Sequence, residues 1–105
     1  SAVRLRADLD LGEAPVALYT GNFEAYQGVE LMAHAAALSE HAVFVFVGGE
    51  AEDIASLKSR LGPASLSRCR FVGRKTPDLL PRFMALADVL VDAKWLHPRA
   101  SHATP

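Results

Sequence analysis

The chain has 105 residues, of which 50% are hydrophobic, and its formal net charge at pH 7 is −1. This length and composition fit one small domain with a packed core. The near-neutral charge gives no field that would favour nucleic acid as a partner, no apolar run approaches a membrane span, and the first residues lack the pattern of a signal peptide.

The predicted elements alternate between strand and helix along the chain. Residues 1–14 form a polar lead-in with the tail of a helix that ends at Gly12. The continuous apolar run at 42–47 is typical of a strand buried on both faces, as in a parallel sheet. Thr76 and Pro77 resemble a helix start, but Pro81 follows so closely that we expect a turn first. We predict strands at 16–19, 42–47, 69–72 and 89–91, and helices at 26–39, 50–61 and 81–87, with Gly62 and Pro63 ending the second helix.

This alternation implies parallel strands joined by right-handed crossovers. We therefore predict a Rossmann-like, three-layer α/β domain with a four-stranded, mainly parallel sheet in the order 3-2-1-4. Residues 92–105 have no periodicity and are expected to be an irregular tail. Because a doubly wound domain normally continues with another helix and strand, residues 1–105 indicate a single but partial domain.

Glycines mark the predicted carboxyl ends of the strands, which is the edge where open α/β sheets bind ligands. Glycine lets a backbone approach a ligand closely, and the N–H groups at a helix start suit a phosphate. Turn formation explains the same glycines without a ligand. The spacing from Gly21 to Gly28 differs from the dinucleotide fingerprint, which disfavours a nicotinamide enzyme. The glycines concerned are Gly21, Gly28, Gly48, Gly49 and Gly73.

Four segments together resemble a known family: 19–28 (YTGNFEAYQG), 46–50 (FVGGE), 71–74 (FVGR) and 85–91 (ALADVLV). They are similar to the donor-binding C-terminal domain of retaining, nucleotide-sugar-dependent glycosyltransferases of family 4, or group 1, which have the two-domain GT-B architecture. The resemblance covers roughly residues 1–91. It implies half of a GT-B C-terminal domain, a nucleotide-sugar donor as partner, no metal cofactor, and a cytoplasmic location.

The resemblance also implies a donor-binding site. Many family members hold the donor diphosphate with an Arg and a Lys at the places of Asn22 and Gln27, which are uncharged here. Any phosphate grip must therefore come from backbone N–H groups and from other cations, Arg74 and Lys75 being the nearest in sequence. The implied site comprises Gly21, Asn22, Gln27, Gly28, Gly49, Glu50, Gly73, Arg74 and Lys75.

Several family features are missing from this chain, so we expect the isolated fragment to be inactive. The family's paired glutamates beyond the fourth strand and its acceptor-binding domain have no counterpart here. No catalytic residue is assigned. No metal site is assigned either, because no pair of histidines has i, i+4 helical spacing together with an acid. The helix-capping interpretation of Asn22 and the first-turn interpretation of Glu50 remain open beside the ligand interpretation.

A non-catalytic interaction or self-association module is the alternative function. A sheet that stops after four strands exposes an edge and apolar surface, both of which favour a homo-oligomer. The charges offer a second surface, because residues 58–82 contain seven cations and one acid, Asp78. One interpretation of this run is solvated helix faces. The other is a cationic rim that faces phosphates, or a peripheral membrane contact of the parent enzyme. Cys69, the only cysteine, is expected to be a buried structural thiol.

Overall fold

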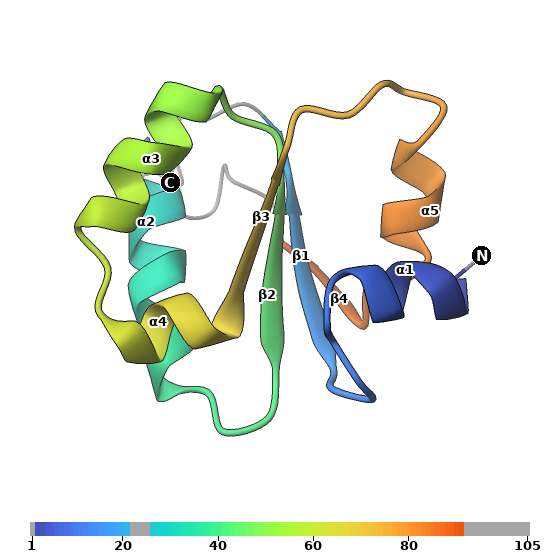
Figure 1. The fold of residues 1–105 in the computed structure, drawn as a ribbon, viewed down its shortest axis with the longest axis horizontal. Coiled ribbons are helices and arrows are strands. Elements are labelled where there is room, and N and C mark those ends of the chain that lie inside the picture. Colours follow the sequence, from blue (N-terminus) through green and yellow to red (C-terminus); the bar gives the residue numbers. More distant parts are fainter. Residues whose placement is uncertain (1, 22–25, 92–105) are drawn as a thin grey trace, which may run out of the picture.

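The computed structural model describes residues 2–21 and 26–91. Within them lies one four-stranded sheet in the order β3-β2-β1-β4 (Figure 1). All of its strand pairs are parallel, which confirms the predicted topology and order. The strands are β1 (Val16–Thr20), β2 (Val43–Val47), β3 (Cys69–Gly73) and β4 (Val89–Val91).

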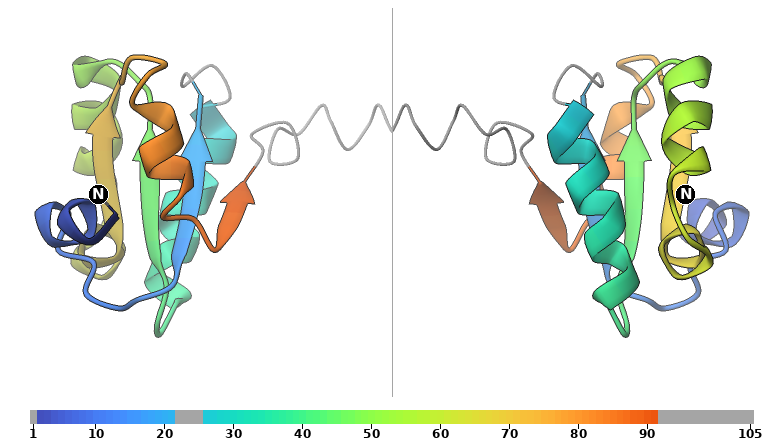
Figure 2. Two further views of the ribbon diagram at one scale, coloured as in Figure 1. Left: turned by 90° about the vertical axis from the view of Figure 1, so that its right-hand side faces the viewer. Right: turned by 90° about the vertical axis from the view of Figure 1, so that its left-hand side faces the viewer.

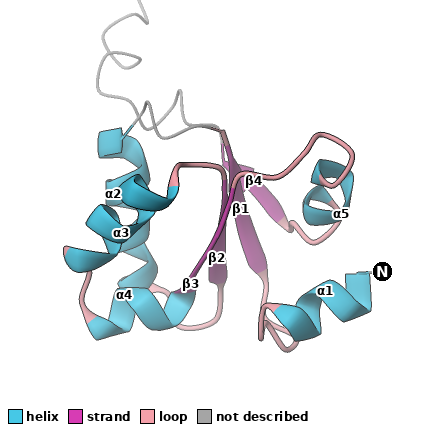
Figure 3. Cartoon of the chain, turned by 45° about the horizontal axis from the view of Figure 1, so that its top comes forward, coloured by secondary structure: helices cyan, strands magenta, loops and turns pink. Residues whose placement is uncertain are grey.

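Helices cover both faces of the sheet and complete three layers. The helices α2, α3 and α4 lie on one face, and α1 and α5 lie on the other (Figures 1 and 3). No helix in the described part of the chain is long and apolar enough to cross a membrane. The bounds are α1 (Ala2–Asp8), α2 (Tyr26–Ala35) with a 3-10 turn η2 (Ala36–Leu38), α3 (Ala51–Ser59), α4 (Pro63–Arg68) and α5 (Leu80–Met84).

The central strands β1 and β2 divide the core into two clusters. Along β2, Val45 belongs to the cluster under α1 and α5, and Phe46 belongs to the cluster under α2, α3 and α4. Both side chains are 0% exposed, so the prediction of a strand buried on both faces is confirmed. Tyr19 and Leu18 divide in the same way on β1. Successive side chains of a strand point to opposite faces, which is why an unbroken apolar run serves both clusters.

The helix α4 was not predicted. We interpreted Gly62 and Pro63 only as the end of the preceding helix, whereas Gly62 is the N-cap of α4 and Pro63 occupies its first turn. Proline is favoured there because its missing N–H is one of those without an intrahelical acceptor. The helix spans six residues, which is too short for apolar periodicity to reveal it.

The segment before β4 follows the expectation of a turn and then a helix, although the helix is shorter. The N–H of Leu79 donates to the carbonyl of Thr76 at 2.9 Å, which forms a turn rather than the helix cap that Thr76 suggested. A hydrogen bond from the Thr76 side chain is the main cause of a lowered pKa of Asp78. The helix α5 then runs from Leu80 to Met84, instead of reaching residue 87.

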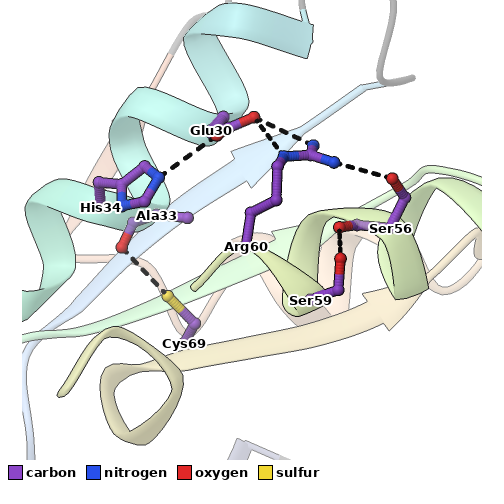
Figure 4. Close-up of polar contacts among 7 residues, drawn as sticks. All are labelled: Glu30, Ala33, His34, Ser56, Ser59, Arg60 and Cys69. Carbon is purple, nitrogen blue, oxygen red and sulfur yellow. Dashed lines mark hydrogen bonds and ion pairs between the residues drawn. The ribbon is translucent and has the colours of Figure 1, made fainter. Parts of the chain in front are cut away.

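Polar contacts join α2 to the end of α3 above the buried cluster (Figure 4). The Arg60 Nε donates to Glu30 Oε1 at 3.0 Å, and its Nη1 donates to Ser56 Oγ at 2.8 Å. His34 Nε2 lies 3.3 Å from the other carboxylate oxygen of Glu30. Cys69 belongs to the buried cluster beneath these contacts. Burial raises the pKa of its thiol to about 11, which is consistent with the expected structural thiol.

Arg70 of β3 fixes the chain that leaves α1. Its Nε donates to the carbonyl of Leu9 at 2.7 Å, and its Nη2 donates to the carbonyl of Asp10 at 3.0 Å. Carbonyls that follow the last turn of a helix have no intrahelical partner, so a guanidinium is a suitable cap. These two hydrogen bonds join β3 to residues that lie 61 and 60 positions earlier in the sequence.

Asp88 closes the start of the β1–β4 pair and gives a structural reason for the Ala-Asp-Val junction. Its N–H donates to the carbonyl of Val16 at 2.9 Å, and its Oδ2 accepts from the Val16 N–H at 2.8 Å. Val16 is 1% exposed. A buried N–H without an acceptor is unfavourable, so this carboxylate stabilises the first residue of β1.

We expect Asp88→Ala to lower the free energy of unfolding by about 1–2 kcal/mol, since it leaves the Val16 N–H without its acceptor. Glu13→Ala removes an exposed carboxylate from the loop before β1 and is the matched control. Urea unfolding followed by far-ultraviolet circular dichroism measures both. Equal midpoints for the two variants would show that the contact contributes nothing.

Candidate functional site

A cavity of about 660 Å³ lies at the carboxyl ends of β1 and β2, beside the loop that follows β3. Both flanks of the cavity carry charge, because α3 begins on one side and the loop after β3 passes on the other. The β1 and β2 ends contribute Thr20, Gly21, Val47, Gly48 and Gly49; α3 and its N-cap contribute Asp53 and Glu50; the loop contributes Arg74 and Lys75, and the start of α5 contributes Leu80.

Backbone contacts between glycines draw the three strand ends together. The N–H of Gly21 donates to the carbonyl of Val47 at 3.0 Å, and the N–H of Gly48 donates to the carbonyl of Gly73 at 2.7 Å. A Cβ added to Gly48 would overlap the carbonyl oxygen of Gly21. The φ of Gly48 is also 125°, which side chains rarely allow. Only glycine at this position lets the β1 and β2 ends meet as they do.

The start of α3 brings backbone donors to the cavity. The N–H of Ile54 donates to the carbonyl of Glu50 at 3.0 Å, so the N–H groups of the three preceding residues have no intrahelical acceptor. Glu50 is the N-cap, and its side chain makes no capping hydrogen bond. The positive end of the helix dipole therefore favours an anion here, although Glu52 and Asp53 in the first turn offset part of that field.

Opposite charges meet across the cavity mouth. Arg74 Nη1 lies 2.8 Å from Glu50 Oε1, and the two side chains are 75% and 59% exposed. An exposed pair of this kind contributes about 0–1 kcal/mol, so a competing anion can separate it at little cost. Lys75 lines the cavity beside them and makes no ion pair among the described residues.

The structure brings five of the predicted donor-site residues together at this cavity: Gly21, Gly49, Glu50, Arg74 and Lys75. Gly73 lies beside it and lines an adjoining cavity of about 500 Å³ between α3 and β3. Gly28 is buried within α2 and is not among the residues that line either cavity. Asn22 and the side chain of Gln27 fall outside the described residues, so a donor-binding role stays a prediction for the whole set.

Sequence reasoning missed two polar residues of the cavity, Thr20 and Asp53. Asp53 follows Glu50 by one helical turn, and this spacing could have placed both carboxylates on one side of α3. Thr20 is the last residue of β1, one position beyond the predicted strand. In residues 2–21 and 26–91, no cluster of three or more histidine, cysteine or acidic side chains is arranged to hold a metal ion.

Comparison with known proteins identifies the fold. No family model and no curated protein matches the sequence. Among solved structures, Anabaena HepE in complex with UDP-glucose superposes with a TM-score of 0.69 and 20% identity, over 85% of this chain and 26% of HepE. The complex of HepE with UDP and glucose gives a TM-score of 0.65 and 21% identity, over 85% of this chain and 25% of HepE.

The present chain thus spans about a quarter of the length of HepE. The superposition confirms the expected fold, an α/β arrangement with helices around a four-stranded parallel sheet. At this level of identity the likeness concerns the fold alone.

We expect Gly48→Ala to destabilise the chain by roughly 1–3 kcal/mol from backbone strain, with a further loss because the Gly21 carbonyl must move. Gly62→Ala is the matched control, because a Cβ at Gly62 meets nothing within 4 Å. Thermal unfolding of both variants tests the difference. Similar melting temperatures for the two variants would contradict the close approach at Gly48.

Proposed function

We propose that the chain is the nucleotide-sugar-binding part of a retaining glycosyltransferase, which transfers a sugar from a nucleoside diphosphate sugar to an acceptor. The observation that carries the proposal is the cavity where two strand ends, the start of α3 and two cations of the loop after β3 meet. The structures of HepE with UDP-glucose, and with UDP and glucose, support it through the shared fold.

In this proposal the donor diphosphate lies against the first turn of α3 and the loop after β3. The N–H groups at the start of α3 donate to phosphate oxygens, as helix starts do in other phosphate sites. Arg74 exchanges its exposed contact with Glu50 for a phosphate oxygen, and Lys75 adds a second cation. Glu50, once released, is free to accept a hydrogen bond from a ribose hydroxyl.

The chemistry assigned to this piece is stabilisation of the leaving group. Breaking the bond between the sugar and the phosphate places negative charge on the nucleoside diphosphate, and preorganised donors lower the energy of that state. Arg74 and Lys75 offset this charge, so we expect transfer without a metal cofactor. The described residues provide no assigned catalytic base, and we expect this chain alone not to catalyse transfer. We also propose a cytoplasmic location for this protein.

Titration of UDP and UDP-glucose into ¹⁵N-labelled chain tests the donor site. We expect amide shifts to change at 20–21, 48–53 and 74–75, because those backbones surround the cavity. Arg74→Gln and Lys75→Gln should each weaken binding roughly two- to fivefold, the range of one exposed charge pair. Arg68→Gln, at the other end of β3, is the matched control and should bind as the parent does. Shifts that avoid these segments would refute the proposal.

Self-association is the second candidate function, and β4 favours it. This strand is at an edge of the described sheet and stands apart from the helices (Figure 2). Val89 and Leu90 are 57% and 55% exposed and, as consecutive strand residues, lie on opposite faces. An exposed strand with apolar side chains on both faces is a surface that a second strand can cover.

If self-association is the function, sedimentation velocity should show a concentration-dependent dimer that Val89→Lys and Leu90→Lys abolish, because charge on an edge strand opposes pairing. Leu38→Lys, at an 86% exposed position in η2, should leave the dimer intact. A monomer at all concentrations would exclude this candidate and leave the donor-binding proposal as it stands.

A further inference from the structure

A second cationic cavity lies between α1 and α5, on the face of the sheet opposite α2, α3 and α4. The two helices contact each other and lie side by side (Figure 1). The cavity between them has a volume of about 480 Å³. Its cations come from three separate elements: Arg4 from α1, Lys75 from the loop after β3, and Arg82 from α5. Their convergence is a property of the fold, since Arg4 is far from the other two in the sequence.

We propose that this cavity binds a phosphate monoester that carries an apolar group. The site is distinct from the proposed donor cavity and holds a different ligand, so it does not depend on the proposed function. Its chemical class follows from the lining: positive side chains suit the phosphate, and apolar side chains suit the group attached to it.

The charges in the cavity favour an anion. Three cations line it against one carboxylate, that of Asp8. Within the described residues, the side chains of Lys75 and Arg82 make neither an ion pair nor a hydrogen bond. Asp78 lies close enough for the Arg82 charge to contribute to the lowered pKa of its carboxyl, yet it is not among the lining residues. The lining therefore keeps a net positive charge that a phosphate can neutralise.

The apolar part of the lining lies between these cations. Phe83 is 6% exposed and belongs to the core cluster under α1 and α5. Leu5 and Leu79 pack against the same cluster and are half-buried. A ligand with a ring or short chain would cover these side chains, and removing apolar surface from water stabilises the complex. Inorganic phosphate, which lacks such a group, should bind less tightly.

Lys75 connects this cavity with the donor cavity, because it lines both. Arg4 and Arg82 line only the cavity between α1 and α5. Substitutions can therefore separate the two sites: Arg82→Gln removes a cation from one, whereas Lys75→Gln removes a cation from both. Arg82 is exposed, so its replacement leaves the core intact.

The test is a titration of phenyl phosphate and of inorganic phosphate into ¹⁵N-labelled chain. We expect amide shifts at 4–5, 75 and 79–83, with tighter binding of phenyl phosphate. Arg82→Gln should raise the dissociation constant for phenyl phosphate roughly two- to fivefold and leave UDP binding unchanged. Lys75→Gln should weaken both ligands, and Arg68→Gln should affect neither.

Sedimentation with vesicles distinguishes a soluble ligand from a lipid headgroup. Vesicles of phosphatidylcholine with phosphatidate present a phosphate monoester at a surface, and pure phosphatidylcholine vesicles are the control. Pelleting with phosphatidate that Arg82→Gln reduces would identify a lipid source, whereas phenyl phosphate binding without pelleting would identify a soluble one.

The proposal is overturned if phenyl phosphate shifts no amide in α1 or α5, or if Arg68→Gln weakens phenyl phosphate binding as much as Arg82→Gln does. If UDP still binds in that event, the donor-site proposal stands.

Discussion

The close contact between Gly48 and Gly21 is the constraint on which the candidate site depends. Two strand ends approach so closely that one backbone carbonyl occupies the space of a missing side chain. The hydrogen bond from Gly48 to Gly73 extends the contact to the third strand. The sheet side of the cavity is therefore made of backbone, whereas the Arg74–Glu50 ion pair lies across its mouth. A negatively charged ligand can approach N–H groups there without displacing a side chain from the floor.

Much of the fold follows from patterns that the sequence states clearly. The apolar run of β2 needs burial on both faces, and helices on both sides of a parallel sheet satisfy that need. The strand order was predicted by analogy with doubly wound folds, and the structure has that order. What escaped prediction is local and short: α4 spans six residues, and Pro63 was taken for a stop although it also suits a first helical turn. The length of α5 was overestimated because residues 85–87 continue the apolar pattern without remaining helical.

The candidate site was predictable to the extent that it depends on topology. Carboxyl ends of parallel strands share one edge, so the sequence alone could place Gly21 and Gly49 together. The contact of Arg74 with Glu50 could not, because it depends on how the loop after β3 turns toward α3. The cavity between α1 and α5 was also beyond prediction. The sequence showed a run of cations from residue 58 to 82, but only the packing of two helices selects which of them meet Arg4.

The hydrogen bonds of Arg70 have a consequence for the order in which the chain acquires its structure. Helix α1 has seven residues, and so short a helix is not stable by itself in water. Its exit is held by a guanidinium from β3, some 60 positions later in the sequence. We therefore expect α1 to settle against the sheet only after β3 has taken its place, since β3 supplies that contact.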